Sequence, residues 1–434
     1  MLTLLGLLTI GALLALILFR VTSVLVALTL VPVAAALAGG FGAQVGVFAM
    51  DGIRAVTPVA ALLAFAVIYF GVMNEAGLFE PLVRRLLGVV GRDPVKISIG
   101  TAAIAAVAHL DGAGASTFMV TIPAMLPIYT RTGMSPLALT CTTALAAGTM
   151  NMLPWGGPTT RAAAALQTGT SELFLPIVPA MVAGMVTVFV CAARIGRKER
   201  IRLAALPNGE AGHAVLAADA EPAPRPAPVD GRWYFNAVLT IATLAALFVE
   251  PLPLAVVFMI ASAIALIVNY PDADVQRERM TGHASAAMMM VTTLFAAGVF
   301  TGILTKSGML GAISADLVRV LSPDVLRHLP IPIGVASMPL SLAFDPDSFY
   351  FGLLPVLAHA AQNAGGSAIE VARAAVLGQM TTGFPVSPLT PATFLLVGLA
   401  GVDLVDHQKR TIPYAFTVTV VMTLVALATR AIQP

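Results

Sequence analysis

Ionisable and hydroxyl side chains stand in the middle of apolar runs of this sequence. The stretch "AVAHLDGAGASTFMVTIPAML", residues 106–126, holds His109 and Asp111 beside glycines, and Ser116 and Thr117 follow. An ionisable group at membrane depth normally faces protein or water and marks a binding or proton-transfer site. His109 can carry a proton near neutral pH, or it can be a core histidine whose ring nitrogens have partners; both interpretations stay open.

A second stretch, residues 341–352, also places ionisable and hydroxyl side chains inside an apolar run. In "SLAFDPDSFYFG" Asp345 and Asp347 flank Pro346, and Ser348 follows. Proline lacks the N–H that a continuous helix needs, so the helix must break here. These residues are candidates for proton acceptance or substrate contact, with helix caps on a solvent-exposed loop as the alternative.

Two further segments place proline, glycine and threonine inside apolar runs, "TMNMLPWGGPTTRAA" and "QMTTGFPVSPLTPATF". Unwound carbonyls in such breaks bind cations, and the helices that restart after them present N–H donors to carboxylates. Arg161 follows the first break, and its guanidinium matches a carboxylate bidentately. The alternative is that Arg161 reaches toward a membrane interface.

The composition of the whole chain indicates whether these segments lie in water or in a membrane. The chain has 434 residues, of which 58% are hydrophobic and 11% charged, and its mean hydropathy is +0.91. Soluble domains carry about 25% charge. We therefore predict a polytopic membrane protein in the bacterial inner membrane, without nucleic-acid partners. Cys141 and Cys191 lie in apolar runs and are predicted to be core residues.

An internal repeat of the sequence relates these four segments in pairs. "YFGVMNEAGLF" at 69–79 aligns with "FTGILTKSGML" at 300–310, and "NMLPWGGPT" at 151–159 aligns with "TGFPVSPLT" at 382–390, both at an offset of 231. "STFMVTIP" at 116–123 aligns with "SFYFGLLP" at 348–355 at an offset of 232. We predict a first membrane repeat at 1–193, a Pro/Ala-rich linker at 194–233 and a second repeat at 234–434.

Basic residues in short loops predict the orientation. Four clusters are assigned to the cytoplasm: Arg84, Arg85, Arg92 and Lys96; Arg194 to Arg202; Arg277 and Arg279; Lys409 and Arg410. This arrangement gives about five crossings per repeat, with both termini outside and the linker in the cytoplasm. Because five is odd, the second repeat is inverted, a layout used by secondary transporters.

Each repeat is expected to contain a re-entrant helical hairpin and a discontinuous helix. The hairpins correspond to Ile97–Tyr129 and Ile331–Ala361, because each half is about 12 residues long and reaches roughly 18 Å, half a bilayer. Ser116 and Thr117 are expected to cap the returning helix. A single long helix kinked at glycine is the alternative to the first hairpin.

The segments "IYFGVMNEAGLFEPLV", "LDGAGASTFM", "NMLPWGGPTTRAA" and "FDPDSFYFGLLPVL" resemble the CitMHS family of citrate–metal:proton symporters, over essentially the whole chain. The resemblance implies two inverted repeats, a homodimer with elevator motion, and uptake of a divalent metal–citrate complex with protons. No resident cofactor or permanent metal site is expected, and the divalent cation would travel with citrate. In the first tip Ala113 stands where the family pattern leads us to expect a second aspartate.

The predicted site combines the resemblance with the residue chemistry. Predicted substrate contacts are Ser116, Thr117, Asn151, Gly156, Gly157, Thr159, Arg161, Ser348 and Thr390. Predicted proton-coupling or metal–citrate contacts are His109, Asp111, Asp345 and Asp347. The alternative function is a sodium-coupled or metal-free carboxylate carrier of the same architecture, which Ala113 favours. An enzyme is not expected, because the sequence has no Gly-x-Gly-Asp or Gly-x-Ser-Gly motif of intramembrane proteases.

Overall fold

The computed structural model describes residues 1–19, 21–91, 93–205, 230–249 and 252–433. Throughout these ranges the secondary structure is helical, with no β-strand, which confirms the predicted all-α class. Residues 206–229 of the predicted linker, and Arg92 of the first basic cluster, lie outside the described residues.

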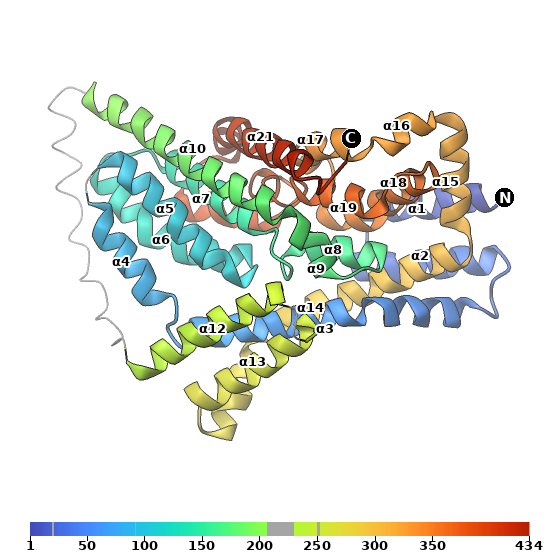
Figure 1. The fold of residues 1–434 in the computed structure, drawn as a ribbon, viewed down its shortest axis with the longest axis horizontal. Helices are drawn as coiled ribbons and strands as arrows, with labels where there is room; N and C mark the ends of the chain where they lie inside the picture. The colour runs from blue at the N-terminus through green and yellow to red at the C-terminus, as the bar shows by residue number, and fades with distance from the viewer. Residues whose placement is uncertain (20, 92, 206–229, 250–251, 434) are drawn as a thin grey trace.

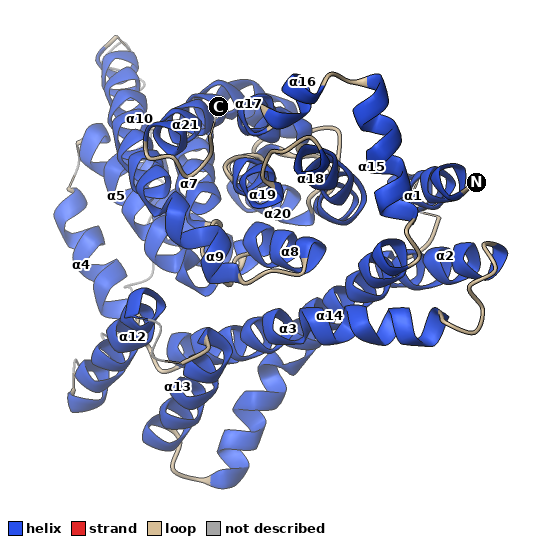
Figure 2. Ribbon diagram, turned by 45° about the vertical axis from the view of Figure 1, so that its right-hand side comes forward, coloured by secondary structure: helices blue, strands red, loops and turns tan. Residues whose placement is uncertain are grey.

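One side of the molecule is a layer built around two long crossing helices, α3 (Val45–Glu75) and α14 (Ala273–Lys306). Around them lie α1 (Leu2–Leu18), α2 (Val24–Ala38), α12 (Gly231–Val249) and α13 (Leu254–Asn269) (Figures 1 and 2). The two backbones touch where glycines face each other. A Cβ on Gly52 would lie 1.9 Å from the carbonyl oxygen of Gly298, so no larger residue fits at this crossing.

The other side is a compact body in which the breaks lie. Its first-half helices are α5 (Pro94–Ala108), α6 (Gly114–Arg131), α7 (Pro136–Met150), α8 (Gly157–Leu166), α9 (Thr170–Phe174) and α10 (Val178–Ala204). Its second-half helices are α17 (Pro330–Leu340), α18 (Leu354–Asn363), α19 (Ala368–Val376), α20 (Pro391–Ala400) and α21 (Leu404–Ala428). The helices α4 (Glu80–Val90), α15 (Met309–Val320) and α16 (Pro323–Arg327) connect the layer to this body (Figure 2). Cys141 and Cys191 are buried and free, as predicted.

Helices α5 and α6 run antiparallel around the first tip. The hydroxyl groups of Thr101 and Tyr129, far from the tip on either helix, lie 3.0 Å apart. Likewise α7 ends at Met150 and α8 restarts at Gly157, so the chain breaks where proline and glycine predict it. The inversion of the repeats and the return of each hairpin to its own side of a membrane remain predictions.

Several long helices extend beyond the predicted apolar runs. Within the described residues, five helical segments are long and apolar enough to cross a bilayer: Val45–Glu75, Thr170–Ala204, Gly231–Val249, Ala273–Lys306 and Leu404–Ala428. The apolar runs of the sequence predict membrane spans at Thr57–Met73 and Ala284–Leu304, whereas α3 begins at Val45 and α14 at Ala273. Polar turns continue a helix beyond its apolar core because the backbone bonds are independent of hydropathy.

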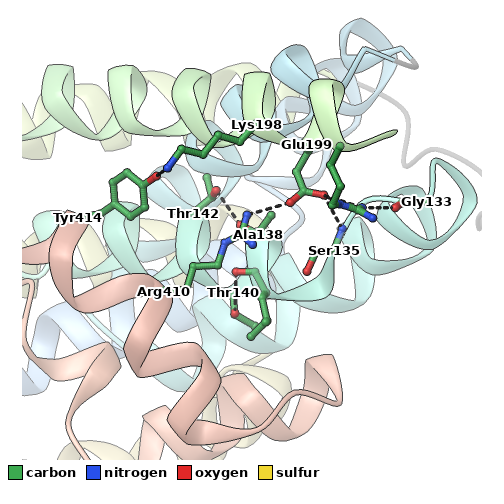
Figure 3. A network of polar contacts seen from close by, with 11 residues as sticks. Gly133, Ser135, Ala138, Thr140, Thr142, Lys198, Glu199, Arg410 and Tyr414 are labelled. Atoms are coloured by element: carbon green, nitrogen blue, oxygen red, sulfur yellow. Dashed lines mark hydrogen bonds and ion pairs between the residues drawn. The ribbon is translucent and has the colours of Figure 1, made fainter. Parts of the chain in front are cut away.

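Helix α10 also continues past residue 194, where the linker was predicted to begin, as far as Ala204. The reason is a buried carboxylate in its last turns. Glu199, 2% exposed, accepts hydrogen bonds from the Ser135 N–H at 3.0 Å and from Arg410 Nη2 at 2.9 Å (Figure 3). Arg202 Nη2 donates to the same carboxylate at 2.8 Å. The end of α10 is therefore fixed to the α6–α7 turn and to α21.

Candidate functional site

The first hairpin tip (residues 109–117) contacts both the first break (residues 149–163) and the second break (residues 379–394). The contacts are made through His109 and Asn151. His109 lies in a short 3-10 turn (His109–Asp111) after α5 and is fully buried. Its Nδ1 lies 2.7 Å from the Thr117 hydroxyl, and its Nε2 lies 3.2 Å from Asn151 Oδ1. Asn151 Nδ2 donates to the Met380 carbonyl at 2.7 Å. Since a carbonyl only accepts, this contact fixes the Asn151 amide, and Nε2 of His109 must donate to Oδ1.

Phe384 of the second break packs on the same tip. Its ring stacks on His109 with centroids 5.9 Å apart, and on Phe118 at 6.0 Å. A Cβ on Gly114 would lie 2.9 Å from the Phe384 ring, so the glycine permits this close approach. The first tip and the second break thus form one packed unit.

The second hairpin tip (residues 345–348) contacts the first break through an ion pair. Arg161 Nε, on α8, donates to Asp347 Oδ1 at 2.7 Å. The two side chains are 23% and 16% exposed, so neither charge is fully sealed in the protein. Asp345 holds the turn by accepting the N–H groups of Asp347 at 3.0 Å and Ser348 at 3.1 Å. Ser348 then opens a single π-helical turn, Ser348–Leu353.

The expected capping of α6 is wrong. The helix begins at Gly114, and its N-cap residue is Ala113, which has no side-chain cap bond. The hydroxyls of Ser116 and Thr117 instead reach back to the Ala113 carbonyl, each at 2.9 Å, as such side chains do within a helix. Asp111 stabilises the tip by accepting the Ala113 N–H at 2.8 Å and the Ser116 hydroxyl.

The remaining predicted residues shape the breaks. A Cβ on Gly156 would lie 2.1 Å from the Asn151 carbonyl, and one on Gly157 would lie 3.1 Å from Met380 Cε. Thr159 is buried and donates to the Met152 carbonyl at 2.7 Å. Thr390 is the N-cap residue of α20, which packs on α6 beside the first tip.

Sequence reasoning missed the residues that join the second break to the second hairpin. Ser341 Oγ accepts the Met380 N–H at 3.2 Å and donates to Gln379 Oε1, while Gln379 Nε2 donates to the Phe344 carbonyl at 3.4 Å. Met380 has φ of 55°, which is uncommon for a non-glycine residue. Gln379 and Met380 lie in the second break, whereas Ser341 and Phe344 lie outside it. An apolar methionine gives no sign in the sequence that its backbone groups bind other side chains.

Trp155 links the first break to the α3–α14 layer. Its Nε1 donates to the Leu110 carbonyl at 2.8 Å, and its ring lies 5.5 Å from Phe70 and 5.1 Å from Phe258. Trp155 therefore packs as an aromatic core residue between the first break and the layer.

The site places hydrogen-bond donors beside the carboxylates of Asp111, Asp345 and Asp347. It offers one guanidinium, hydroxyls and backbone groups at two tips and two breaks, and the residues described include no group of three or more His, Cys, Asp or Glu able to hold a metal. Long apolar helices of membrane-spanning length, beside shorter helices that break where the two halves meet, are the arrangement of multi-pass membrane transporters.

The chain belongs to the citrate transporter family, CitMHS, whose family model matches residues 3–378. It is 44% identical over 427 residues to the "Citrate transporter" of Bacillus subtilis (strain 168), covering 98% of each chain. It is 39% identical over 436 residues to the "Mg(2+)/citrate complex secondary transporter" of the same organism, covering 100% of this chain and 99% of the relative. These relatives are transporters and not enzymes.

Two solved structures share the fold. The Alcanivorax borkumensis YdaH transporter superposes with a TM-score of 0.60 at 17% identity, covering 98% of both chains. Neisseria gonorrhoeae MtrF superposes with a TM-score of 0.59 at 14% identity, covering 90% of this chain and 85% of that chain. At these identities the likeness concerns the fold alone.

Proposed function

We propose that this protein is a secondary active transporter that takes up citrate as a divalent metal–citrate complex together with protons. The observation that carries the proposal is the Arg161–Asp347 pair, which joins the first break to the second tip and keeps partial exposure. The relative named as a Mg(2+)/citrate complex secondary transporter, alike over its whole length, supports the metal-complexed form.

The chemistry of the complex suits this pair. Metal–citrate at neutral pH carries about one negative charge, and complexation masks carboxylates that would be costly to desolvate. In the proposal, Arg161 binds the free carboxylate of the complex, while Asp347 faces its metal. The pair and the complex together carry about one net negative charge, and in the proposal a proton taken up with the complex neutralises it, so no uncompensated charge is buried.

The other predicted residues have supporting roles in this proposal. Asp111 and Asp345 each hold a tip turn, and they remain candidates, with His109, for proton acceptance or metal–citrate contact. Gly156, Gly157 and Thr390 contribute hydroxyl or backbone groups around the substrate, and the hydroxyls of Ser116 and Ser348 exchange their bonds to Asp111 and Asp345 for bonds to it. Thr117, Asn151 and Thr159 already have internal partners and act by shaping the site.

Topology and assembly belong to the same proposal. The protein lies in the bacterial inner membrane as two inverted repeats, 1–193 and 234–434, with residues 194–233 in the cytoplasm and both termini outside. It works as a homodimer in which the body carrying the breaks moves against the α3–α14 layer. The contact of Trp155 with Phe70 and Phe258 lies on that moving boundary.

The test is uptake of labelled citrate into proteoliposomes with Mg²⁺, Ca²⁺, Na⁺ or a chelator across an imposed pH gradient. Uptake that needs a divalent cation and an inward proton gradient is expected. Ala113 favours the second candidate, a sodium-coupled or metal-free carboxylate carrier, because the first tip has one carboxylate fewer than expected. Uptake that survives chelation, or that needs Na⁺, selects this second candidate.

A further inference from the structure

His407 bridges the two halves of the chain behind the second break. It is fully buried in the second turn of α21. Its Nε2 lies 2.9 Å from the Pro385 carbonyl, and its Nδ1 lies 3.0 Å from the Thr140 hydroxyl of α7. Nothing in the sequence points to this role, because His407 lies between Asp406 and the basic pair at 409–410, as a surface residue would.

The direction of these bonds follows from their chemistry. The Pro385 carbonyl only accepts, so Nε2 carries the hydrogen, and the neutral ring leaves Nδ1 to accept a threonine hydroxyl. Thr140 and Thr411, the latter 3.3 Å from Nδ1, are both placed to donate. The ring is thus held from both sides in one tautomer.

The segment that His407 holds is the one that packs on the first tip. Phe384–Val386 forms a short 3-10 turn, and Phe384 stacks on His109. Gln408 adds a second bond to the turn by donating from Nε2 to the Val386 carbonyl at 2.8 Å. An unwound turn lacks regular helix bonds, so these two α21 side chains supply donors that its carbonyls need.

We propose that His407 is a positioning residue of the substrate site, which fixes the Phe384–Val386 turn against the first hairpin tip through its bond to the Pro385 carbonyl. The effect that we expect on citrate uptake rests on the proposed function. Without the bond the turn samples other conformations, and the apparent affinity falls by the fraction of molecules that keep the binding geometry.

The first experiment compares His407→Ala, His407→Leu and His407→Gln in citrate uptake. Alanine and leucine remove the donor and are expected to raise the KM about tenfold, with the maximal rate within about twofold. Glutamine keeps a side-chain N–H and is expected to bring the KM back to within about threefold of the parent. An unchanged KM in His407→Ala, or no rescue by glutamine over leucine, overturns the proposal. Ser262→Ala removes a buried hydroxyl that lies 2.7 Å from the Phe258 carbonyl and 3.2 Å from the Phe65 carbonyl. It is the matched control and should keep the parental KM.

The second experiment needs no substrate. Val386 is buried, so a Val386→Cys reporter in a Cys141→Ala/Cys191→Ala background should react slowly with a maleimide. Labelling is expected to be several-fold faster with His407→Ala and unchanged with His407→Gln, in protein that elutes as the parent does in size-exclusion chromatography. Equal rates overturn the proposal. If the parent takes up no citrate, the proposed function fails, while the labelling rates still decide the role of His407.

Discussion

Replacing Asn151 by alanine should damage both the fold and the site. The side chain is 3% exposed and makes two contacts: Nδ2 donates to the Met380 carbonyl at 2.7 Å, and Oδ1 faces His109 Nε2 at 3.2 Å. Alanine leaves one buried acceptor and one buried donor without these partners. Each such group costs about 1–3 kcal/mol. Since the 3.2 Å contact is the weaker one, we expect the free energy of unfolding to fall by about 2–4 kcal/mol.

The same change should weaken substrate binding. Asn151 hydrogen-bonds to both the first tip and the second break, so its loss leaves the packing of Phe384 to hold the two segments together. If about 2 kcal/mol of the lost energy falls on the assembled site, the KM for citrate rises about 30-fold. Asn151→Asp should behave similarly, because a carboxylate oxygen would then face the Met380 carbonyl oxygen and repel it.

Asn236→Ala separates stability from function. Asn236 is 1% exposed and exchanges two amide hydrogen bonds with Asn269, at 2.8 and 2.9 Å, in the α12–α13 contact away from the breaks. Denaturant titration of the purified protein should show comparable losses of stability for Asn151→Ala and Asn236→Ala. Uptake kinetics should show a raised KM for Asn151→Ala alone. A parental KM in Asn151→Ala, or an equal rise in Asn236→Ala, would refute the reasoning.

Three further outcomes are expected. Arg161→Lys keeps the charge but loses the planar fork, so the KM for citrate should rise about tenfold, whereas a parental KM in an uptake assay would remove Arg161 from substrate contact. Glu199→Ala should lower the free energy of unfolding by about 3 kcal/mol in denaturant titration, and the exposed partner change Arg202→Ala by about 1 kcal/mol or less; similar losses would contradict the buried network. The Arg200 hydrogen bonds hold the pKa of Asp93 below its ordinary value. This carboxylate therefore contributes stability above its unfolded pKa of about 4, and the contribution is lost as the pH falls through the lower folded pKa. The difference in melting temperature between the parent and Asp93→Asn should shrink as the pH is lowered from 7 toward 3, and a constant difference would exclude the ion pair as its source.

The candidate site was predictable in part because its signals are local. Proline beside aspartates at 345–347, and proline with two glycines in the "PWGGP" segment, strongly disfavour regular helix, so the places where the chain breaks could be predicted from the sequence. A single proline is a weaker signal, since Pro58 and Pro123 lie inside continuous helices. The prediction that Ser116 and Thr117 cap the helix was wrong, because they could do so only if the helix began three or four residues after Gly114. The exact residue at which a helix begins depends on its tertiary packing, and sequence patterns locate it only to within a few residues.

By itself the sequence determined the all-α membrane class, the length of the apolar elements, and the positions of the breaks. These follow from composition, hydropathy and the backbone chemistry of proline and glycine, which act within a few residues. Only the tertiary structure decided which break meets which tip. Arg161 pairs with Asp347 across 186 positions and Asn151 with the Met380 carbonyl across 229. Such pairs depend on how packed helices bring distant segments together, and a backbone carbonyl or a buried histidine such as His407 acquires its partner only there.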